Sequence, residues 1–263
     1  MNLVDSHNHL HFNDFRKDRS EVMDRARQAG VKAMLLVGID PDDTCRAIET
    51  AEAGDGLFAS VGIHPQMAGV FSPDDVLALE ALAQNHKIVA VGETGFDLYR
   101  TPDTENQQKE LFRAHIELAR TCSLPLIIHD RDAHRQTLDL LEEEGAWSLG
   151  GMFHCFSGDA AMARQIVDKG FFLSVPGVLT YKNAAVLRQA VRACPLESLL
   201  VETDAPYLAP VPYRGKRNEP SFLIETVREL AAIRKLDAEQ MAEITTENFF
   251  RLFARRSMPL NHG

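Results

Sequence analysis

The stretch VDSHNHL, residues 4–10, starts as an apolar run and ends in two histidines with His-x-His spacing. Other apolar runs also end in side chains that bind metals: Glu93 in IVAVGET, His129 in LPLIIHD, His154 in GMFHCF and Asp204 in LLVETDAP. In a barrel of parallel strands, residues at the carboxyl ends of the strands converge on one mouth. The spacing therefore predicts a metal centre built from residues far apart in the sequence.

Apolar runs alternate with segments of helical periodicity along the chain. We expect strands at 3–6, 32–39, 57–64, 87–93, 124–130, 149–155, 171–175 and 198–204. Helices are expected at 18–29, 41–53, 73–84, 105–121, 133–144, 160–169, 184–193 and 221–235, with a last helix near 237–255. About eight strand–helix units in 263 residues favour an α/β fold, the (β/α)8 TIM barrel, over an open doubly wound sheet. We expect one domain over residues 1–263.

The composition is that of an ordinary soluble protein, with 45% hydrophobic and 25% charged residues. Four cysteines without CxxC spacing indicate reduced thiols, and the N-terminal residues lack a signal-peptide pattern, so we expect a cytoplasmic protein. No apolar run is long enough to span a bilayer, and we expect no membrane partner. A formal net charge of −10 disfavours broad electrostatic capture of nucleic acid, so a phosphate substrate would need local cations.

Imidazoles and carboxylates together suit zinc, manganese or iron, and magnesium where carboxylates dominate. We predict that one or two divalent ions are bound by His7, His9, Glu93, His129, His154 and Asp204. Glu93 would bridge two ions, and Asp204 would take a proton from the attacking water, so both are predicted to be catalytic. The alternative, buried histidines and surface carboxylates with structural roles, explains their joint placement at strand ends less well.

Several nearby residues have less certain roles in the pattern. Glu202 lies two residues before Asp204 on the same strand face but deeper, so a structural role is as consistent as a catalytic one. His64 in SVGIHPQ ends the third strand, where we predict a substrate contact, with a structural role as the alternative. We expect His11 to lie in a loop. The remaining histidines are expected to be structural or exposed: His86, His115, His134 and His262.

The motifs VDSHNHLHF, VGIHP, VGETGFDLYR, IIHDRDA, FHCFSG and VETDAPYLAP occur in this order over nearly the whole chain. In this combination the sequence resembles the TatD-type metal-dependent deoxyribonucleases. The resemblance implies an amidohydrolase-like TIM barrel with a one- or two-metal centre on the six residues named above. It also implies hydrolysis of DNA, often as a 3′→5′ exonuclease on single strands, supported by magnesium or manganese, with zinc in related members. Gln66 replaces a histidine that family members often carry, and GFDLYR replaces GLDYYR; both departures concern substrate contacts.

Cations and aromatic residues follow the predicted ligands and would lie at the same mouth. We predict that DNA is contacted by His64, Tyr99, Arg100, Arg131, Arg214, Lys216 and Arg217. Cations would bind phosphates, and aromatic rings, among them Tyr99, Phe156, Tyr181 and Tyr207, would stack on bases. The alternative is a solvated basic loop and aromatic residues that close the top of the barrel.

The sequence thus predicts a metal-dependent phosphodiester hydrolase acting on single-stranded DNA, and we expect a monomer. In this prediction His7, His9, Glu93 and Asp204 hold one ion, and Glu93 shares the second with His129 and His154. Other chemistries on the same centre remain open: hydrolysis of a carboxylic ester, lactone or amide, or tRNA-linked and DNA-repair reactions. A binding protein that has lost turnover is disfavoured because all six ligand positions are filled.

Overall fold

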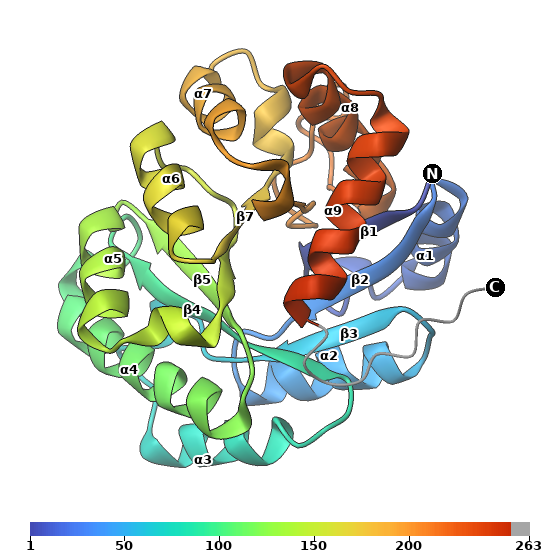
Figure 1. The fold of residues 1–263 in the computed structure, drawn as a ribbon. Coiled ribbons are helices and arrows are strands. Elements are labelled where there is room, and N and C mark those ends of the chain that lie inside the picture. The colour runs from blue at the N-terminus through green and yellow to red at the C-terminus, as the bar shows by residue number, and fades with distance from the viewer. Residues whose placement is uncertain (254–263) are drawn as a thin grey trace.

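The fold is a ring of parallel strands, seen in a computed structural model that describes residues 1–253 (Figure 1). Within these residues the sheet has eight strands, each hydrogen-bonded to the next in chain order. They are β1 (Leu3–Asn8), β2 (Val31–Val37), β3 (Leu57–Val61), β4 (Ile88–Asp97), β5 (Leu126–Arg131), β6 (Gly151–Phe153), β7 (Phe172–Val175) and β8 (Leu199–Val201). Backbone bonds from Asp204 to His7 (2.9 Å) and from His9 to Ala205 (2.8 Å) join the two ends of the sheet. The (β/α)8 barrel prediction is confirmed.

Helices connect successive strands and surround the ring. They are α1 (Arg19–Gln28), α2 (Pro41–Glu52), α3 (Pro73–Leu82), α4 (Glu105–Cys122), α5 (His134–Glu143), α6 (Ala160–Asp168), α7 (Ala185–Ala193) and α8 (Leu223–Arg234). The N-termini of two helices follow directly from the sequence. Asp40 caps α2 and Ser72 caps α3, and each is followed by a proline at the first helical position. The cap of α3 is reciprocal, since the side chains of Ser72 and Asp75 each bind the other's backbone N–H.

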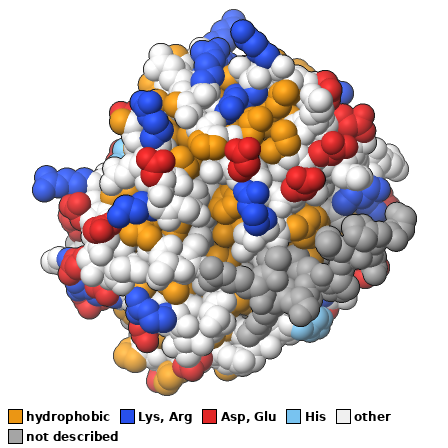
Figure 2. Space-filling view, in the orientation of Figure 1, with side chains coloured by type: hydrophobic (Ala, Val, Ile, Leu, Met, Phe, Trp, Pro, Cys, Tyr) orange, Lys and Arg blue, Asp and Glu red, His pale blue; other side chains and the backbone are white. Residues whose placement is uncertain are grey.

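The last helix, α9 (Ala238–Phe253), lies across the end of the barrel opposite the mouth (Figure 1). Its Phe249 and Phe253 pack with Val4, Phe172 and Leu200, which stand in the first or second positions of their strands. On this face, among the residues drawn in colour, acidic and basic side chains are interspersed (Figure 2). A polyanion would therefore find little single-sign potential over that part of the surface.

Four strands end two or three residues earlier than predicted. We expected ends at residues 39, 64, 155 and 204, but β2 ends at Val37, β3 at Val61, β6 at Phe153 and β8 at Val201. His64 therefore follows β3 and does not end it, and its side chain caps the short helix that begins at Pro65. Beyond β6 and β8 the chain leaves the extended region, with φ angles of 44° at Cys155 and 54° at Asp204. β4 is instead longer than predicted and reaches Asp97. The last helix begins as expected, whereas the end predicted at residue 255 lies outside the described residues. Among residues 1–253, no helix is long and apolar enough to cross a membrane.

Candidate metal centre

His7 of β1 and His9, which directly follows β1, meet carboxylates from β4 and the segment after β8. His7 Nε2 lies 3.4 Å from Glu93 Oε2 and 3.8 Å from Asp204 Oδ1. His9 Nε2 lies 4.0 Å and 3.6 Å from the same two oxygens, and 3.3 Å from His7 Nε2. Four ligand atoms from three parts of the barrel therefore surround one position, which we call the first ligand group.

The other oxygen of Glu93 belongs to a second ligand group. Oε1 lies 2.5 Å from His129 Nδ1 and 2.8 Å from His154 Nε2, and those two nitrogens are 3.1 Å apart. His64 Nε2 adds a further contact, 3.3 Å from the same oxygen. Glu93 is almost completely buried, and its carboxylate lies between the two groups with one oxygen directed to each.

The donor set fits a divalent metal. His9 Nδ1 lies 2.9 Å from the carbonyl oxygen of Val37, which only accepts, so Nδ1 carries the proton and Nε2 is a free lone pair. That lone pair faces His7 Nε2 at 3.3 Å, an arrangement that a cation between the rings would stabilise. Ligands about 2.1 Å from one ion lie about 3.0–3.4 Å from each other, close to the nitrogen–nitrogen spacing in both groups.

Both carboxyl groups at the centre are held in the ionised form. Burial acts to raise the pKa of Glu93, but His154 and His64 beside it hold that pKa well below its ordinary value. Burial also acts to raise the pKa of Asp204, but the neighbouring His9 and His7 lower it overall. Ionised carboxylates in a buried place can bind a cation or accept a proton.

Local sequence explains how β4 and β5 present their ligands. Gly95 pairs with His129 in the sheet, and its φ of 135° is a value that other residues rarely adopt. A Cβ on Gly95 would collide with the backbone oxygen of His129. Glycine thus allows the close strand approach that brings Glu93 and His129 into one group.

The residue before Asp204 is held by a buried carboxylate, Asp5, that the sequence prediction missed. Asp5 accepts a hydrogen bond from the backbone N–H of Thr203 at 2.9 Å and one from its hydroxyl at 2.5 Å. Burial raises the pKa of Asp5 to about 7. Asp5 ties the segment after β8 to β1, one residue before Asp204. The sequence shows that Asp5 shares a strand face with His7, but it does not show that Asp5 binds Thr203.

Asp97 is a second residue that the sequence prediction missed. Its Oδ2 lies 3.3 Å from His129 Nε2 and accepts a hydrogen bond from the Gln66 amide at 2.8 Å. Burial acts to raise the pKa of Asp97, but the hydrogen bonds from His129 and Gln66 lower it overall. The sequence did contain a hint, because Asp97 lies four residues after Glu93 and so shares its strand face. Gln66, where family members often carry histidine, here helps to hold Asp97 and through it His129.

The predicted substrate-binding cations fall into two classes. Arg217 makes two bonds to Asp18, of 2.9 and 2.6 Å, so its charge is already paired. Among residues 1–253, no carboxylate lies within 4.0 Å of the basic groups of Arg100, Arg131 or Arg214, nor of Lys216. These four remain available for an anion, whereas Arg217 would have to leave Asp18.

Three of these arginines lie over tyrosine rings, with Arg100 Cζ 5.9 Å from the ring centre of Tyr99. Arg131 Cζ is 4.3 Å from the ring centre of Tyr99, and Arg214 Cζ is 4.4 Å from that of Tyr181. Tyr99 is 59% exposed, so one side of its ring can meet another group. Because β4 and β5 lie across the ring from β7 and β8, the two pairs flank the ligand groups from different sides.

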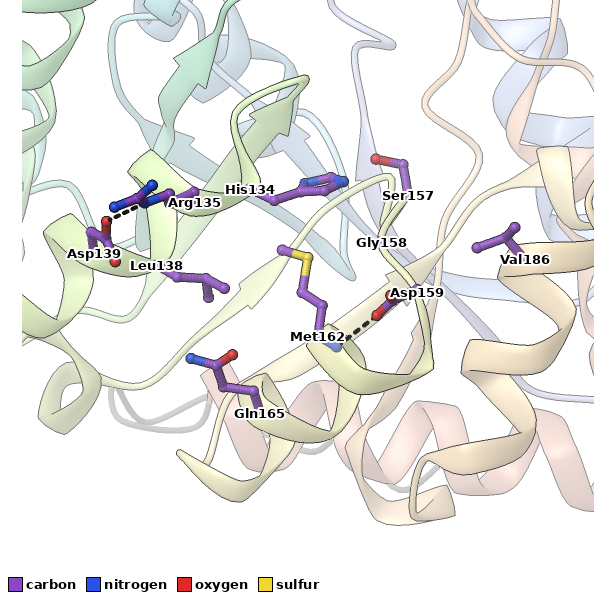
Figure 3. Close-up of a pocket in the computed structure, with 10 residues that line it drawn as sticks. All are labelled: His134, Arg135, Leu138, Asp139, Ser157, Gly158, Asp159, Met162, Gln165 and Val186. Atoms are coloured by element: carbon purple, nitrogen blue, oxygen red, sulfur yellow. Dashed lines mark hydrogen bonds and ion pairs between the residues drawn. The ribbon is translucent and has the colours of Figure 1, made fainter.

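A groove of about 620 Å³ between α5 and α6 lies apart from the ligand groups (Figure 3). His134 and Met162 line it, together with Ser157 and Asp159, which follow β6. None of the six predicted ligands contributes to its lining. The groove is therefore separate from the two ligand groups.

A (β/α)8 barrel whose mouth gathers histidines and carboxylates around a shared glutamate has the architecture of the metal-dependent hydrolases. The chain belongs to the family described as TatD related DNase, whose model matches residues 4–254. It is a metal-dependent hydrolase of that family, and the predicted resemblance is confirmed.

The relatives cover nearly the whole chain. An uncharacterized metal-dependent hydrolase, YabD of Bacillus subtilis (strain 168), is 40% identical over 95% of this chain and 98% of its own length. A 3′-5′ ssDNA/RNA exonuclease, TatD of Salmonella typhimurium (strain LT2), is 35% identical over 91% of this chain and 94% of its own. The solved structure of the TatD homolog YjjV from Escherichia coli K12 matches with a TM-score of 0.90 and 31% identity, covering 95% and 97% of the two chains.

Proposed function

We propose that this hydrolase cleaves phosphodiester bonds of DNA, removing nucleotides from the 3′ end of single strands. The observation that carries the proposal is the Glu93 carboxylate placed between two groups of ligand atoms, an arrangement suited to a two-ion phosphodiester site. A 35% identical relative named as a 3′-5′ ssDNA/RNA exonuclease supports the choice of substrate. The ligands in this proposal are His7, His9, Glu93, His129, His154 and Asp204.

Divalent ions bound there, with magnesium or manganese favoured and zinc as the alternative, would neutralise phosphate charge and lower the pKa of water. Glu93 would hold both positions at a fixed separation through its two oxygens. Asp204 would accept the proton of the attacking water, because its ionised Oδ1 faces His7 and His9 and it is almost completely buried. His64, 3.3 Å from Glu93 Oε1, would contact the substrate beside the second ligand group.

The cations of the mouth would position the strand. A chain with a formal net charge of −10 repels DNA at long range, so unpaired arginines near the centre carry the attraction. Arg100, Arg131 and Arg214 would bind phosphates. The exposed ring of Tyr99, with Arg131 on it, would stack on a base, which contributes about 1–3 kcal/mol and tolerates any sequence.

The test is turnover of single-stranded DNA labelled at either end, by metal-stripped protein supplied with magnesium, manganese or zinc in turn. Asp204→Asn should lower metal-dependent cleavage about 10²–10⁴-fold. The exposed Asp42→Asn serves as the matched control and should leave it unchanged. Release of single nucleotides from the 3′ end is expected. Failure of every metal-loaded sample to cleave DNA, with turnover of a lactone, ester or amide instead, would overturn the proposal.

A further inference from the structure

Three buried polar atoms without hydrogen-bond partners lie behind the two ligand groups. They are Nδ1 of His7, Nδ1 of His154 and Oε2 of Glu202. The three side chains are at most 7% exposed, and each offers one ligand atom within 4.8 Å of the others. An unpaired polar atom in such a place is costly, so three together call for a functional explanation.

The two histidines are held in parallel. Their rings stack with centroids 4.0 Å apart and an angle of 14°. His7 directs Nε2 to the first ligand group and His154 directs Nε2 to the second. An imidazole that offers the Nε2 lone pair to a metal carries its proton on Nδ1. Two N–H donors are therefore left on the side away from the metal positions.

Glu202 is built into the barrel so that it can meet both donors. Its Oε1 accepts a hydrogen bond of 2.7 Å from the backbone N–H of Cys155, the residue after His154. Its own backbone N–H donates to the Val175 carbonyl of β7 at 3.1 Å. His154 Nδ1 lies 3.6 Å from Oε1, while Oε2 is the oxygen without a partner. The carboxylate is thus fixed from the ends of β6 and β7.

We propose that Glu202 is a positioning residue that accepts the Nδ1–H of both His7 and His154. One carboxylate would then set the tautomer and ring orientation of one ligand in each group. Glu202 would thereby couple the two metal positions through the Nδ1 side of the histidines, whereas Glu93 couples them on the Nε2 side. Such acceptors make ligating imidazoles more basic and fix their geometry. The inference rests on the metal centre of the proposed function but not on its substrate, so it survives if DNA is the wrong substrate.

The first test is a calorimetric titration of zinc into metal-stripped protein. Glu202→Gln keeps the size of the side chain but can place an N–H₂ against the two N–H donors. We expect zinc affinity to fall about 10–100-fold. Ser174→Ala is the matched control, because Ser174 is also fully buried but bonds to Ser6 at 2.7 Å and to no ligand. Thermal unfolding of the metal-stripped variants checks that both fold.

The second test is ¹⁵N NMR of the imidazoles in the zinc-loaded wild-type protein, which needs no variant. We expect His7 and His154 both to carry Nδ1–H, with protons that exchange slowly with water. Unchanged zinc affinity in a folded Glu202→Gln protein would overturn the proposal, and so would an Nε2–H tautomer at either histidine. A third equivalent of zinc that is lost in the variant would also overturn it, because Glu202 would then be a ligand. Should Glu202→Gln fail to fold, the NMR result alone decides.

Discussion

The two ends of this barrel are filled in opposite ways. At the end covered by α9, Phe249 and Phe253 pack on apolar residues of the strands, which stabilises the fold without any bound group. At the mouth, buried histidine nitrogens face one another and two ionised carboxylates at about 3–4 Å. One end therefore maintains the fold by apolar packing, whereas the other gathers buried polar groups whose burial bound cations would offset.

A change at Glu93, the carboxylate shared by the two ligand groups, should reduce metal-dependent activity more than any other change. Glu93→Gln removes the charge between the two ligand groups while the side chain keeps its size. We expect metal-dependent turnover to fall by about a thousandfold or more, because both metal positions and the charge of the site are lost together. The measurement is the cleavage rate at saturating metal. A Glu93→Gln variant that retains a tenth of wild-type activity would show that Glu93 does not bridge two metal ions.

Substitutions at the end covered by α9 should lower the stability of the fold without changing the catalytic rate. Phe253→Ala removes a fully buried ring and should lower the free energy of unfolding by about 3–5 kcal/mol. Phe250, only partly buried, gives the matched control, and Phe250→Ala should cost clearly less. Chemical denaturation measures both variants. Turnover per folded molecule at low temperature should stay at the wild-type level, and a specific loss in Phe253→Ala would mean that the two ends are coupled.

Acid should destabilise the fold through a histidine outside the metal centre. Burial lowers the pKa of His115 to about 4, and its ring accepts from the Ile63 N–H at 2.9 Å while Nδ1 bonds to the Leu111 carbonyl at 2.7 Å. The folded pKa lies below the unfolded value near 6.5, so the neutral ring stabilises the fold fully above that pH. This contribution is lost as the pH falls towards 4, by about 3 kcal/mol.

The measurement is urea unfolding at pH 7, 5 and 4 for the wild type and His115→Gln. Glutamine does not titrate, and the metal-site histidines contribute equally to both proteins. The stability advantage of the wild type should therefore shrink by about 3 kcal/mol between pH 7 and pH 4. A difference between the two proteins that does not change with pH would show that His115 is not held neutral.

Divalent cations should stabilise the mouth directly. At a metal concentration one hundred times the dissociation constant, binding to the folded state adds about 2.7 kcal/mol to the free energy of unfolding. Thermal unfolding of metal-stripped protein with and without manganese measures the effect, and it should be absent in Glu93→Gln. An equal shift in that variant would place the stabilising ion elsewhere.

The substrate-binding cations should give the smallest effects. Arg131→Ala should raise KM for single-stranded DNA up to about tenfold, with kcat little changed and a shallower dependence on salt. Arg217→Ala is the informative comparison, because that guanidinium is bound to Asp18. We expect its effect on KM to be smaller than that of Arg131→Ala, and the reverse order would show that Arg217 leaves Asp18 to bind substrate.

Much of the barrel, and the clustering of the six candidate ligands at its mouth, could be predicted from sequence, because apolar runs that end in His, Glu or Asp indicate both a strand and a candidate ligand. The supporting contacts could not. Asp5 meets Thr203 and Glu202 meets Cys155 across long stretches of chain, so only the closed ring brings them together. The positive φ angles at Cys155 and Asp204, which lie beyond the ends of β6 and β8, were not predicted either, although aspartate adopts this conformation more readily than most residues.

The most direct test of the central claim is a crystal structure of the manganese-loaded protein with anomalous scattering to locate the ions. We expect one manganese ion in the first ligand group and a second at His129 and His154. Both would be bound through opposite oxygens of Glu93. Manganese bound only away from Glu93, for example in the groove between α5 and α6, would contradict it.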